Sequence, residues 1–309
     1  MPSLMTALLA GLAATPCLAG VAHQVASVQE TSPVLQEQDG RTVVARDNVP
    51  HLQPKTPKYF HEPGSGMSRG HYDQRFFKQE IEYEEHRVVL RDLVHSYLAA
   101  MQNLGVETWL AHGTLLGWWW SGRVMPWDYD LDVQVTNDTM QWMGDHLNRT
   151  EHAFNATTPG GTVAKKYLLD VNPHHVDIDR GDGMNIIDAR WIDMTNGMFI
   201  DITGLREREA HLPGVWSCKN KHRYPSQDLW PMRTTEFEGV RARIPYNFEK
   251  ILSTEYGPKS LVTEEHAGHR WDRNIKEWVK MSPVEEQKRL TVARERKKQR
   301  LIRDGRYPS

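Results

Sequence analysis

The chain has 309 residues, of which 39% are hydrophobic and 25% charged, a balance typical of a globular protein that buries a sizeable core. Its formal net charge of -2 and its pI near 6.7 exclude a strongly basic surface, so we expect no nucleic acid and no anionic membrane surface as a partner. Cys17 and Cys218 are the only cysteines, which excludes a disulfide framework and a cysteine-based zinc site.

The N-terminus predicts the secretory pathway, meaning the Golgi lumen or secretion. Residues 1–19 are small and apolar, as in a signal peptide, and they are too few for a typical transmembrane helix. A short, uncleaved membrane anchor is the alternative. Three Asn-x-Thr sequons lie close together, at Asn137, Asn148 and Asn155, and predict N-glycosylation on the surface of a secreted protein.

Residues 20–75 are rich in Gln, Pro, Gly and His, with prolines at positions 50, 54, 57 and 63. Such a composition breaks any periodic pattern and predicts a flexible stem or linker. It would hold the next domain away from an anchor or wrap over that domain.

A folded domain is expected over residues 76–283. Apolar residues recur at helical intervals over 78–104, and Gly105 supplies a stop. Further helices are predicted over 114–120 and 138–147, and strands over 106–111, 130–135, 163–171, 187–193 and 198–203. This alternation favours an α/β (α+β) domain with a central mixed sheet.

Residues 284–309 form a charged C-terminal helix or tail rich in Lys and Arg. We interpret it as a solvent-exposed helix. Docking on an acidic glycan or on a partner is the alternative.

Three aspartates, Asp128, Asp130 and Asp132, occupy alternate positions after a glycine turn. In an extended strand, side chains at i and i+2 point to one face, so the carboxylates would lie together. Like charges this close repel one another unless a cation lies between them, and carboxylate oxygens suit Mg²⁺ or Mn²⁺. The spacing predicts a metal site for phosphoryl transfer, with a solvated turn as the alternative.

The turn before the aspartates is a candidate phosphate site. Gly113 and Thr114 open a short helix, whose free backbone N–H groups would face an anion. His112 could bond a phosphate oxygen or cap the turn. The tryptophans at 118, 119 and 120 could stack on a base or sugar, but apolar neighbours favour the core, so at most one is expected to contact a ligand.

The order of these elements resembles a known family. A glycine turn, a short helix and then a strand with two aspartates between hydrophobic residues are similar to the nucleotidyltransferase superfamily. HGTLLG and PWDYDLDV, with the triple tryptophan, DARWIDMTNGMFIDITGL and CKNKHRYP, resemble the LicD family, which includes bacterial phosphocholine transferases and fukutin-related proteins. The likeness spans residues 109–257 and is greatest to a fungal secretory branch linked to mannosylphosphate transfer.

The resemblance implies a nucleotidyltransferase-like mixed β-sheet flanked by helices, with a metal held by Asp130 and Asp132. It implies a third carboxylate on a neighbouring strand, for which Asp201 in MFIDIT is the first choice and Asp193 the second. An unpartnered charge on such a strand would cost several kcal/mol, so a metal or another cation is expected near Asp201. Asp128 is expected to support substrate or phosphate binding at this site or to mark the entry to the strand.

The substrates implied by the resemblance are a nucleotide-activated donor, such as GDP-mannose or a CDP-linked alcohol, and a glycan or glycoprotein acceptor. The metal would bridge the donor diphosphate, and Asp201 would hold a second metal or take the proton of the acceptor hydroxyl. The family implies substrate binding around Lys219, Lys221 and Arg223, with a solvated loop as the alternative. Arg123 could neutralise the leaving phosphate or simply face solvent.

The leading interpretation is therefore a phosphotransferase that acts on glycans. A catalytically silent regulator of such a transferase and a metal-dependent phosphodiesterase are the alternatives.

Overall fold

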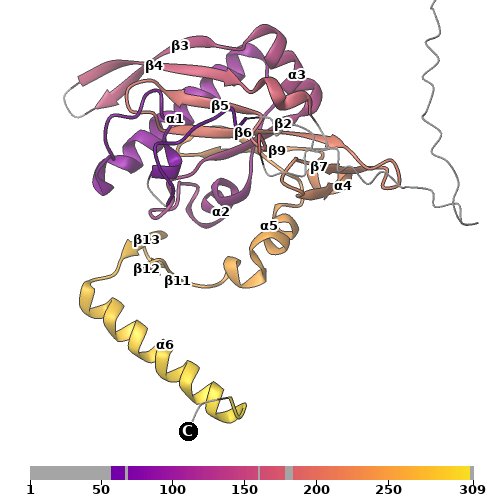
Figure 1. The fold of residues 1–309 in the computed structure, drawn as a ribbon. Helices are drawn as coiled ribbons and strands as arrows, with labels where there is room; N and C mark the ends of the chain where they lie inside the picture. Colours follow the sequence, from indigo (N-terminus) through magenta and orange to yellow (C-terminus); the bar gives the residue numbers. More distant parts are fainter. Residues whose placement is uncertain (1–56, 67–68, 159–160, 178–183, 307–309) are drawn as a thin grey trace, which may run out of the picture. The chain divides into compact units, whose positions relative to one another are not determined.

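A computed structural model describes residues 57–66, 69–158, 161–177 and 184–306 (Figure 1). They belong to one compact unit that covers residues 54–309. The predicted signal peptide and residues 20–56 of the predicted stem lie outside the described residues. Within the described part, no helix has the length and apolar character needed to cross a membrane.

An eight-stranded mixed sheet forms the centre of the domain, as predicted (Figure 1). Its main path runs β1-β2-β6-β5-β4-β3. Strands β2 and β6 are parallel, and the other neighbours are antiparallel. The strand bounds are β1 Trp109–Leu110, β2 Asp132–Thr136, β3 Thr150–Thr158, β4 Gly161–Val171, β5 Ala189–Asp193, β6 Phe199–Glu207, and, extending from β6, β7 Val215–Ser217 and β8 Arg223–Pro225.

Helices pack against this sheet. The longest helix of the domain, α1 (Tyr83–Leu104), buries an apolar stripe that includes Leu90, Leu93 and Tyr97, and it packs against β5 and β6. It begins later than predicted and ends as predicted at Gly105, which adopts a left-handed conformation with φ 70°. The other helices are α2 (His112–Ser121), α3 (Asn137–His146), α4 (Ser226–Leu229) and α5 (Phe248–Tyr256), with short 3-10 turns η1 (Arg69–His71), η2 (Pro173–Val176) and η3 (Pro258–Leu261).

Two small antiparallel sheets complete the described part of the domain. Strands β9 (Arg233–Phe237) and β10 (Val240–Ile244) pair with each other. Strands β11 (Glu265–His266), β12 (His269–Asp272) and β13 (Glu277–Lys280) form the second small sheet.

Residues 57–66 and 69–75, here called the strap, pack on the domain. Phe60 is 3% exposed and Tyr72 is completely buried. The backbone N–H of Tyr59 donates to Asn185 Oδ1 at 2.8 Å, and its hydroxyl donates to Asp170 at 2.9 Å. This part of the predicted stem therefore wraps over the domain, which is one of its two expected roles.

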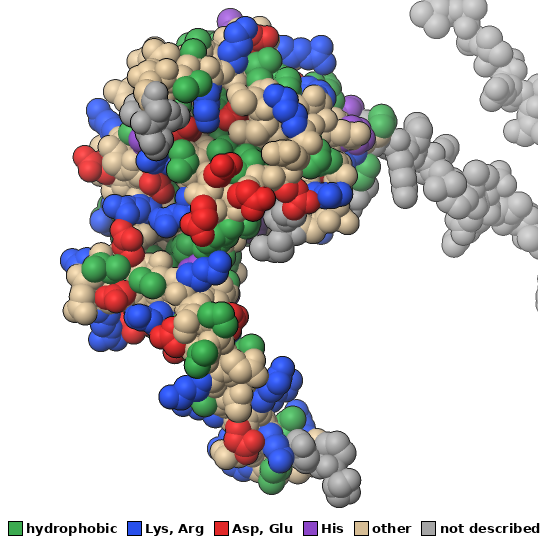
Figure 2. Space-filling model, turned by 90° about the vertical axis from the view of Figure 1, so that its left-hand side faces the viewer, with side chains coloured by type: hydrophobic (Ala, Val, Ile, Leu, Met, Phe, Trp, Pro, Cys, Tyr) green, Lys and Arg blue, Asp and Glu red, His purple; other side chains and the backbone are tan. Residues whose placement is uncertain are grey.

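Helix α6 (Pro283–Arg303) is the predicted charged helix. Ser282 caps its start in a reciprocal box with Glu285, and the helix contains no buried residue. Lys and Arg side chains line much of it (Figure 2). Most of its residues are exposed, which agrees with the solvated interpretation.

Candidate active site

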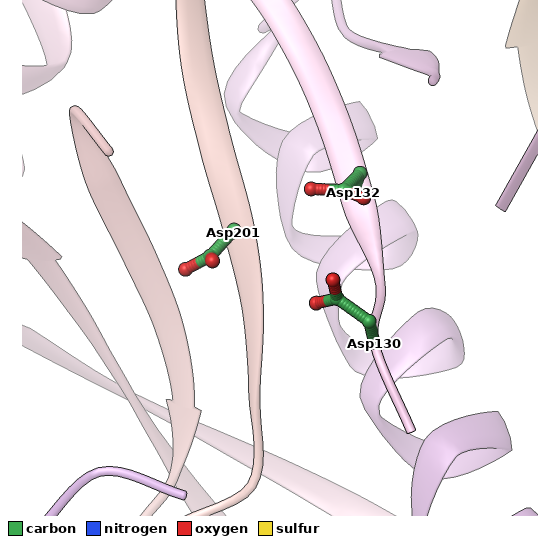
Figure 3. Close-up of side chains that lie close together, drawn as sticks. All are labelled: Asp130, Asp132 and Asp201. Atoms are coloured by element: carbon green, nitrogen blue, oxygen red, sulfur yellow. The ribbon is translucent and has the colours of Figure 1, made fainter. Parts of the chain in front are cut away.

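Three aspartates meet at the junction of β2 and β6. Asp132 and Asp201 are register partners on these parallel strands, and Asp130 lies two residues before Asp132. The apolar partners Val133 and Ile202 are buried, so by strand alternation the aspartates share the other face. One ligand oxygen of each carboxylate lies within 4.8 Å of the others, and Asp130 and Asp132 turn toward β6 (Figure 3). The group could therefore hold a metal ion.

Main-chain hydrogen bonds fix the positions of these aspartates. The backbone N–H of Asp132 donates to Thr114 Oγ1 at 2.8 Å, which ties β2 to the start of α2. The backbone N–H of Asp201 donates to the Leu131 carbonyl at 2.8 Å. The two strands therefore hold the carboxylates against their mutual repulsion.

The crowding of carboxylates disfavours their charged forms. Burial raises the pKa of Asp132 well above its ordinary value, and the charges of Asp130 and Asp201 raise it further. Burial also raises the pKa of Asp201 to about 6, although Arg190 acts in the opposite direction. The pKa of Asp128 rises to about 6 through burial and the charge of Asp130. A cation between the carboxylates would relieve this cost.

The protein supplies one cation itself, Arg190 on β5. Its Nε donates to Asp201 Oδ1 at 2.8 Å, and its Nη2 donates to Glu62 Oε1 of the strap at 2.7 Å. The guanidinium carbon lies 3.6 Å from the centroid of the Phe199 ring. The expectation of a cation beside Asp201 is thus confirmed, but sequence reasoning missed Arg190. A lone arginine inside the apolar strand ARWID was the available signal.

The remaining oxygens leave room for a metal. Asp130 Oδ1 is buried and accepts no hydrogen bond among the described residues. The strap residue His71 approaches it, with its Nδ1 at 3.6 Å. Although burial lowers the pKa of His71, the Asp130 carboxylate outweighs burial and raises it. A hard divalent cation fits this set of carboxylate oxygens, because such ions prefer oxygen ligands.

The glycine turn mainly positions the acidic residues. A side chain at Gly113 would place its Cβ 2.9 Å from Asp128 Oδ2, so only glycine lets Asp128 lie there. Thr114 is buried. The His112 side chain is paired with α5, because its Nδ1 lies 2.9 Å from Glu255 Oε2. Burial raises the pKa of Glu255, but His112 and Tyr224 hold it below its usual value.

Two pockets lie on either side of the acidic group, and Asp130 lines both. The aromatic pocket, about 480 Å³, is bounded by Gly113, Trp120, Trp127, Lys259 and Trp278 and also contains Asp128 and Asp132. The strap pocket, about 430 Å³, is bounded by Lys58, Phe60, Glu62, Ile186 and Arg190 and also contains Asp201. A reaction at the acidic group could therefore draw on two separate binding spaces.

Comparison with known proteins identifies the domain. The family model for the LicD/FKTN/FKRP nucleotidyltransferase domain matches residues 105–247. The chain carries a LicD-family domain. Asp130, Asp132 and Asp201 all lie inside the matched residues, as does Arg190. The strap and residues 248–283 lie outside them, yet the strap lines one pocket and residues of the other segment line the second.

Curated relatives match this chain over part of their own length. Mannosyltransferase regulator 4 of Saccharomyces cerevisiae is 28% identical over 253 residues, which are 76% of this chain and 21% of that protein. Mannosyltransferase regulator 14 of the same yeast is 32% identical over 156 residues, which are 48% of this chain and 16% of that protein. The Homo sapiens protein Ribitol 5-phosphate transferase FKRP is 21% identical over 187 residues, which are 55% of this chain and 31% of that protein. The chain spans a third or less of each of these relatives.

The structure corrects the role predicted for Lys219 and places Lys221 and Arg223 outside both pockets. Lys219 is buried, with its Nζ 2.8 Å from Asp188 Oδ1 and hydrogen-bonded to two backbone carbonyls, so it cannot reach a substrate. Arg223 is exposed and pairs with Glu209, while Lys221 is exposed on the same loop. Neither lines the aromatic pocket or the strap pocket.

Arg123 also lies away from the acidic group. It forms an exposed ion pair with Glu277 and lines a different hollow beside α1. The alternative interpretation, a solvent-facing arginine, describes it better than a phosphate-neutralising role.

The tryptophans agree with the expectation that most belong to the core. Trp118 donates from Nε1 to Thr235 Oγ1, and Trp119 packs beside Phe248. Of the three, Trp120 lines the aromatic pocket, where it packs against Trp278. One tryptophan of the run is therefore placed to contact a ligand.

Asp193, the second choice for the third carboxylate, has a structural role. It is completely buried, and its oxygens accept hydrogen bonds from the Thr195 backbone and the Asn196 side chain in the turn after β5. It therefore stabilises that turn and is not part of the acidic group.

The three sequons lie in and beside two neighbouring elements. Asn155 is exposed on β3, Asn148 is exposed just before it, and Asn137 is half-buried at the start of α3. Their glycosylation stays a prediction.

Proposed function

We propose that this chain is a metal-dependent phosphotransferase that moves a phospho-substituent, such as mannose 1-phosphate, from a nucleotide-diphosphate donor to a glycan hydroxyl. The observation that supports this proposal is a group of three carboxylates in the LicD-family domain. This group lies between two pockets. A transferase must bring two substrates to one reactive centre. The apolar N-terminus and the sequons support a location in the secretory pathway, with a glycoprotein or glycan as acceptor.

Asp130, Asp132 and Asp201 would hold Mg²⁺ or Mn²⁺. When bound, such an ion neutralises charge on the donor phosphates. The aromatic pocket suits the donor, because Trp120 and Trp127 offer faces for a base. Lys259 lines the same pocket and forms no ion pair within the described residues, so its charge is available to a phosphate. Gly113, at the start of α2, adds backbone N–H groups.

The transfer itself joins the acceptor oxygen to the phosphorus and breaks the bond from that phosphorus to the departing nucleoside monophosphate. Asp201 would either bind the metal or accept the hydroxyl proton through Oδ2, because Arg190 occupies Oδ1. Its pKa of about 6 lets it be charged, and so able to accept a proton, at neutral pH. Arg190 would stabilise its orientation.

The test is the double variant Asp130→Asn/Asp132→Asn, assayed for transfer from GDP-mannose and from CDP-linked alcohols to a mannose oligosaccharide with Mn²⁺. We expect a loss of about 10³-fold, since removing preorganised charge at a reaction centre has effects of this order. Asp145→Asn is the matched control, because Asp145 is exposed on α3. Transfer at the wild-type rate in the double variant would refute the proposal.

A second candidate, a regulator without catalysis, is favoured by the yeast relatives, both of which are called mannosyltransferase regulators. It predicts that the wild-type chain transfers nothing from any donor in the panel. Donor cleavage without any acceptor glycan would instead support the phosphodiesterase alternative. The same assay therefore separates the three functions.

A further inference from the structure

We propose that the strap pocket is the acceptor subsite and that it binds an uncharged, hydroxyl-rich sugar. This rests on the proposed function only in assigning the reaction to the acidic group that borders the pocket. Asp130 and Asp201 both line the strap pocket, so a hydroxyl bound there would lie beside the carboxylates.

The polar groups of the pocket suit hydroxyls. The Arg190 side chain is 4% exposed, and its Nη1 is buried without a hydrogen-bond partner among the described residues. A buried donor without an acceptor is unfavourable, and a ligand oxygen would remove that cost. Glu62 beside it supplies carboxylate oxygens that accept hydrogen bonds. A sugar hydroxyl both donates and accepts, so it can use both kinds of group.

The charges of the pocket disfavour a diphosphate. Lys58 pairs with Glu62, and Arg190 pairs with both Glu62 and Asp201. The described cations of this pocket therefore already face carboxylates, so no surplus positive charge is left. The aromatic pocket also contains Asp128, Asp130 and Asp132, but its Lys259 forms no ion pair with a carboxylate among the described residues and so stays available to a phosphate. The donor phosphates belong on that side and the neutral acceptor on the strap side.

Apolar groups give the pocket a surface for a sugar ring. Phe60 from the strap and Ile186 and Ile187 before β5 line it, which matches the common pattern of apolar walls with a few polar groups that fix orientation. Asn185 joins the two walls, because it accepts from the Tyr59 backbone and donates to the Pro57 carbonyl. The strap lies outside the residues matched by the family model, so acceptor choice would depend partly on this segment.

The test fills the pocket by Ile186→Trp. Ile186 is half-buried at its wall. The matched control is Ile275→Trp, because Ile275 is 60% exposed in the turn between β12 and β13. Binding of a mannose oligosaccharide and of GDP-mannose is measured by calorimetry in the presence of Mn²⁺. We expect the oligosaccharide dissociation constant to rise at least about tenfold in Ile186→Trp alone, and the GDP-mannose constant to change less than about twofold.

Loss of GDP-mannose binding with retained oligosaccharide binding would overturn the inference, as would a wild-type chain that binds no oligosaccharide. If Ile186→Trp fails to fold by circular dichroism, Ser65→Trp replaces it, because Ser65 lines the pocket from an exposed position. The binding measurement does not require turnover, so it can fail or succeed independently of transfer. If the chain binds the sugar at this pocket but transfers nothing, the binding site is supported and the proposed function is refuted. If Ile186→Trp transfers normally with an unchanged glycan KM, the proposed function is supported and this pocket is not the acceptor subsite.

Discussion

Asp188 and Asp201 are buried carboxylates within the same sheet region, 2% and 9% exposed, yet their surroundings differ. Asp188 has its own counter-ion in Lys219, and its Oδ2 accepts the Gly204 backbone N–H at 2.8 Å. Asp201 shares Arg190 with Glu62 and lies beside Asp130 and Asp132. Burial raises the pKa of both carboxyls, but other carboxylates raise it further only at Asp201. A balanced pair stabilises the fold, whereas an unbalanced group is suited to binding a cation.

The largest expected effect comes from breaking the balanced pair. Lys219→Met leaves Asp188 buried without its cation, so we expect the free energy of unfolding to fall by about 3–5 kcal/mol. Lys221→Met is the control, because Lys221 is exposed on the same loop and such surface changes stay within about 0.5 kcal/mol. Urea denaturation measures both. Equal stability of the two variants would show that Asp188 does not depend on Lys219.

The unbalanced group should respond to metal instead. Mn²⁺ at 100 times its dissociation constant is expected to stabilise the wild-type chain by about 2.7 kcal/mol, and Asp132→Asn should abolish this effect. Thermal unfolding with Mn²⁺ and with EDTA measures it. Asp188→Asn is the comparison variant, since it keeps all three proposed ligands. Equal stabilisation of Asp132→Asn and the wild type would place the ion elsewhere.

The metal effect should also depend on pH. The pKa of about 6 of Asp201 lies above its ordinary 3.8, so protons compete with the metal as pH falls through 6, and stabilisation by Mn²⁺ should decline between pH 7 and 5. Without metal, the stability of the chain is expected to change with pH in the opposite direction. A raised folded-state pKa contributes stability that is complete below pH 3.8 and is lost as pH rises through 6. The EDTA-treated chain should therefore gain this contribution on acidification, and a metal effect independent of pH would contradict the assignment.

The acidic group could be predicted from the sequence because its aspartates lie in short local patterns. Two aspartates at i and i+2 share a face of any strand, and Asp201 lies in a short apolar run that had to be a buried strand. The partners of these residues come from distant segments. Arg190 meets Asp201 through antiparallel register, and Glu62 and His71 reach the site from a segment that composition alone marks as a linker.

The role of Lys219 was mispredicted for the same reason. Lys219 is one of several charges in CKNKHRYP, and nothing local distinguishes a lysine that pairs with a buried aspartate from one that faces a substrate. Helices α1 to α3 and strands β1, β2 and β4 to β6 were predicted from sequence patterns, whereas strand β3 of the central sheet and strands β7 to β13 were not predicted. Tertiary pairing decides such elements.

The smallest expected effect is at Arg123, which contrasts with the buried Arg190. Arg123 pairs with Glu277 where both side chains are exposed, by 51% and 39%, and exposed pairs contribute about 0–1 kcal/mol. Arg123→Ala should therefore change the free energy of unfolding by less than about 0.5 kcal/mol and leave the dissociation constants of Mn²⁺ and GDP-mannose unchanged. Arg190→Lys should alter metal affinity, because an ammonium cannot bond Asp201 and Glu62 with the geometry of a planar guanidinium. Tenfold weaker GDP-mannose binding in Arg123→Ala would return this residue to the donor site, and would mean that the surface pair with Glu277 opens when the donor binds.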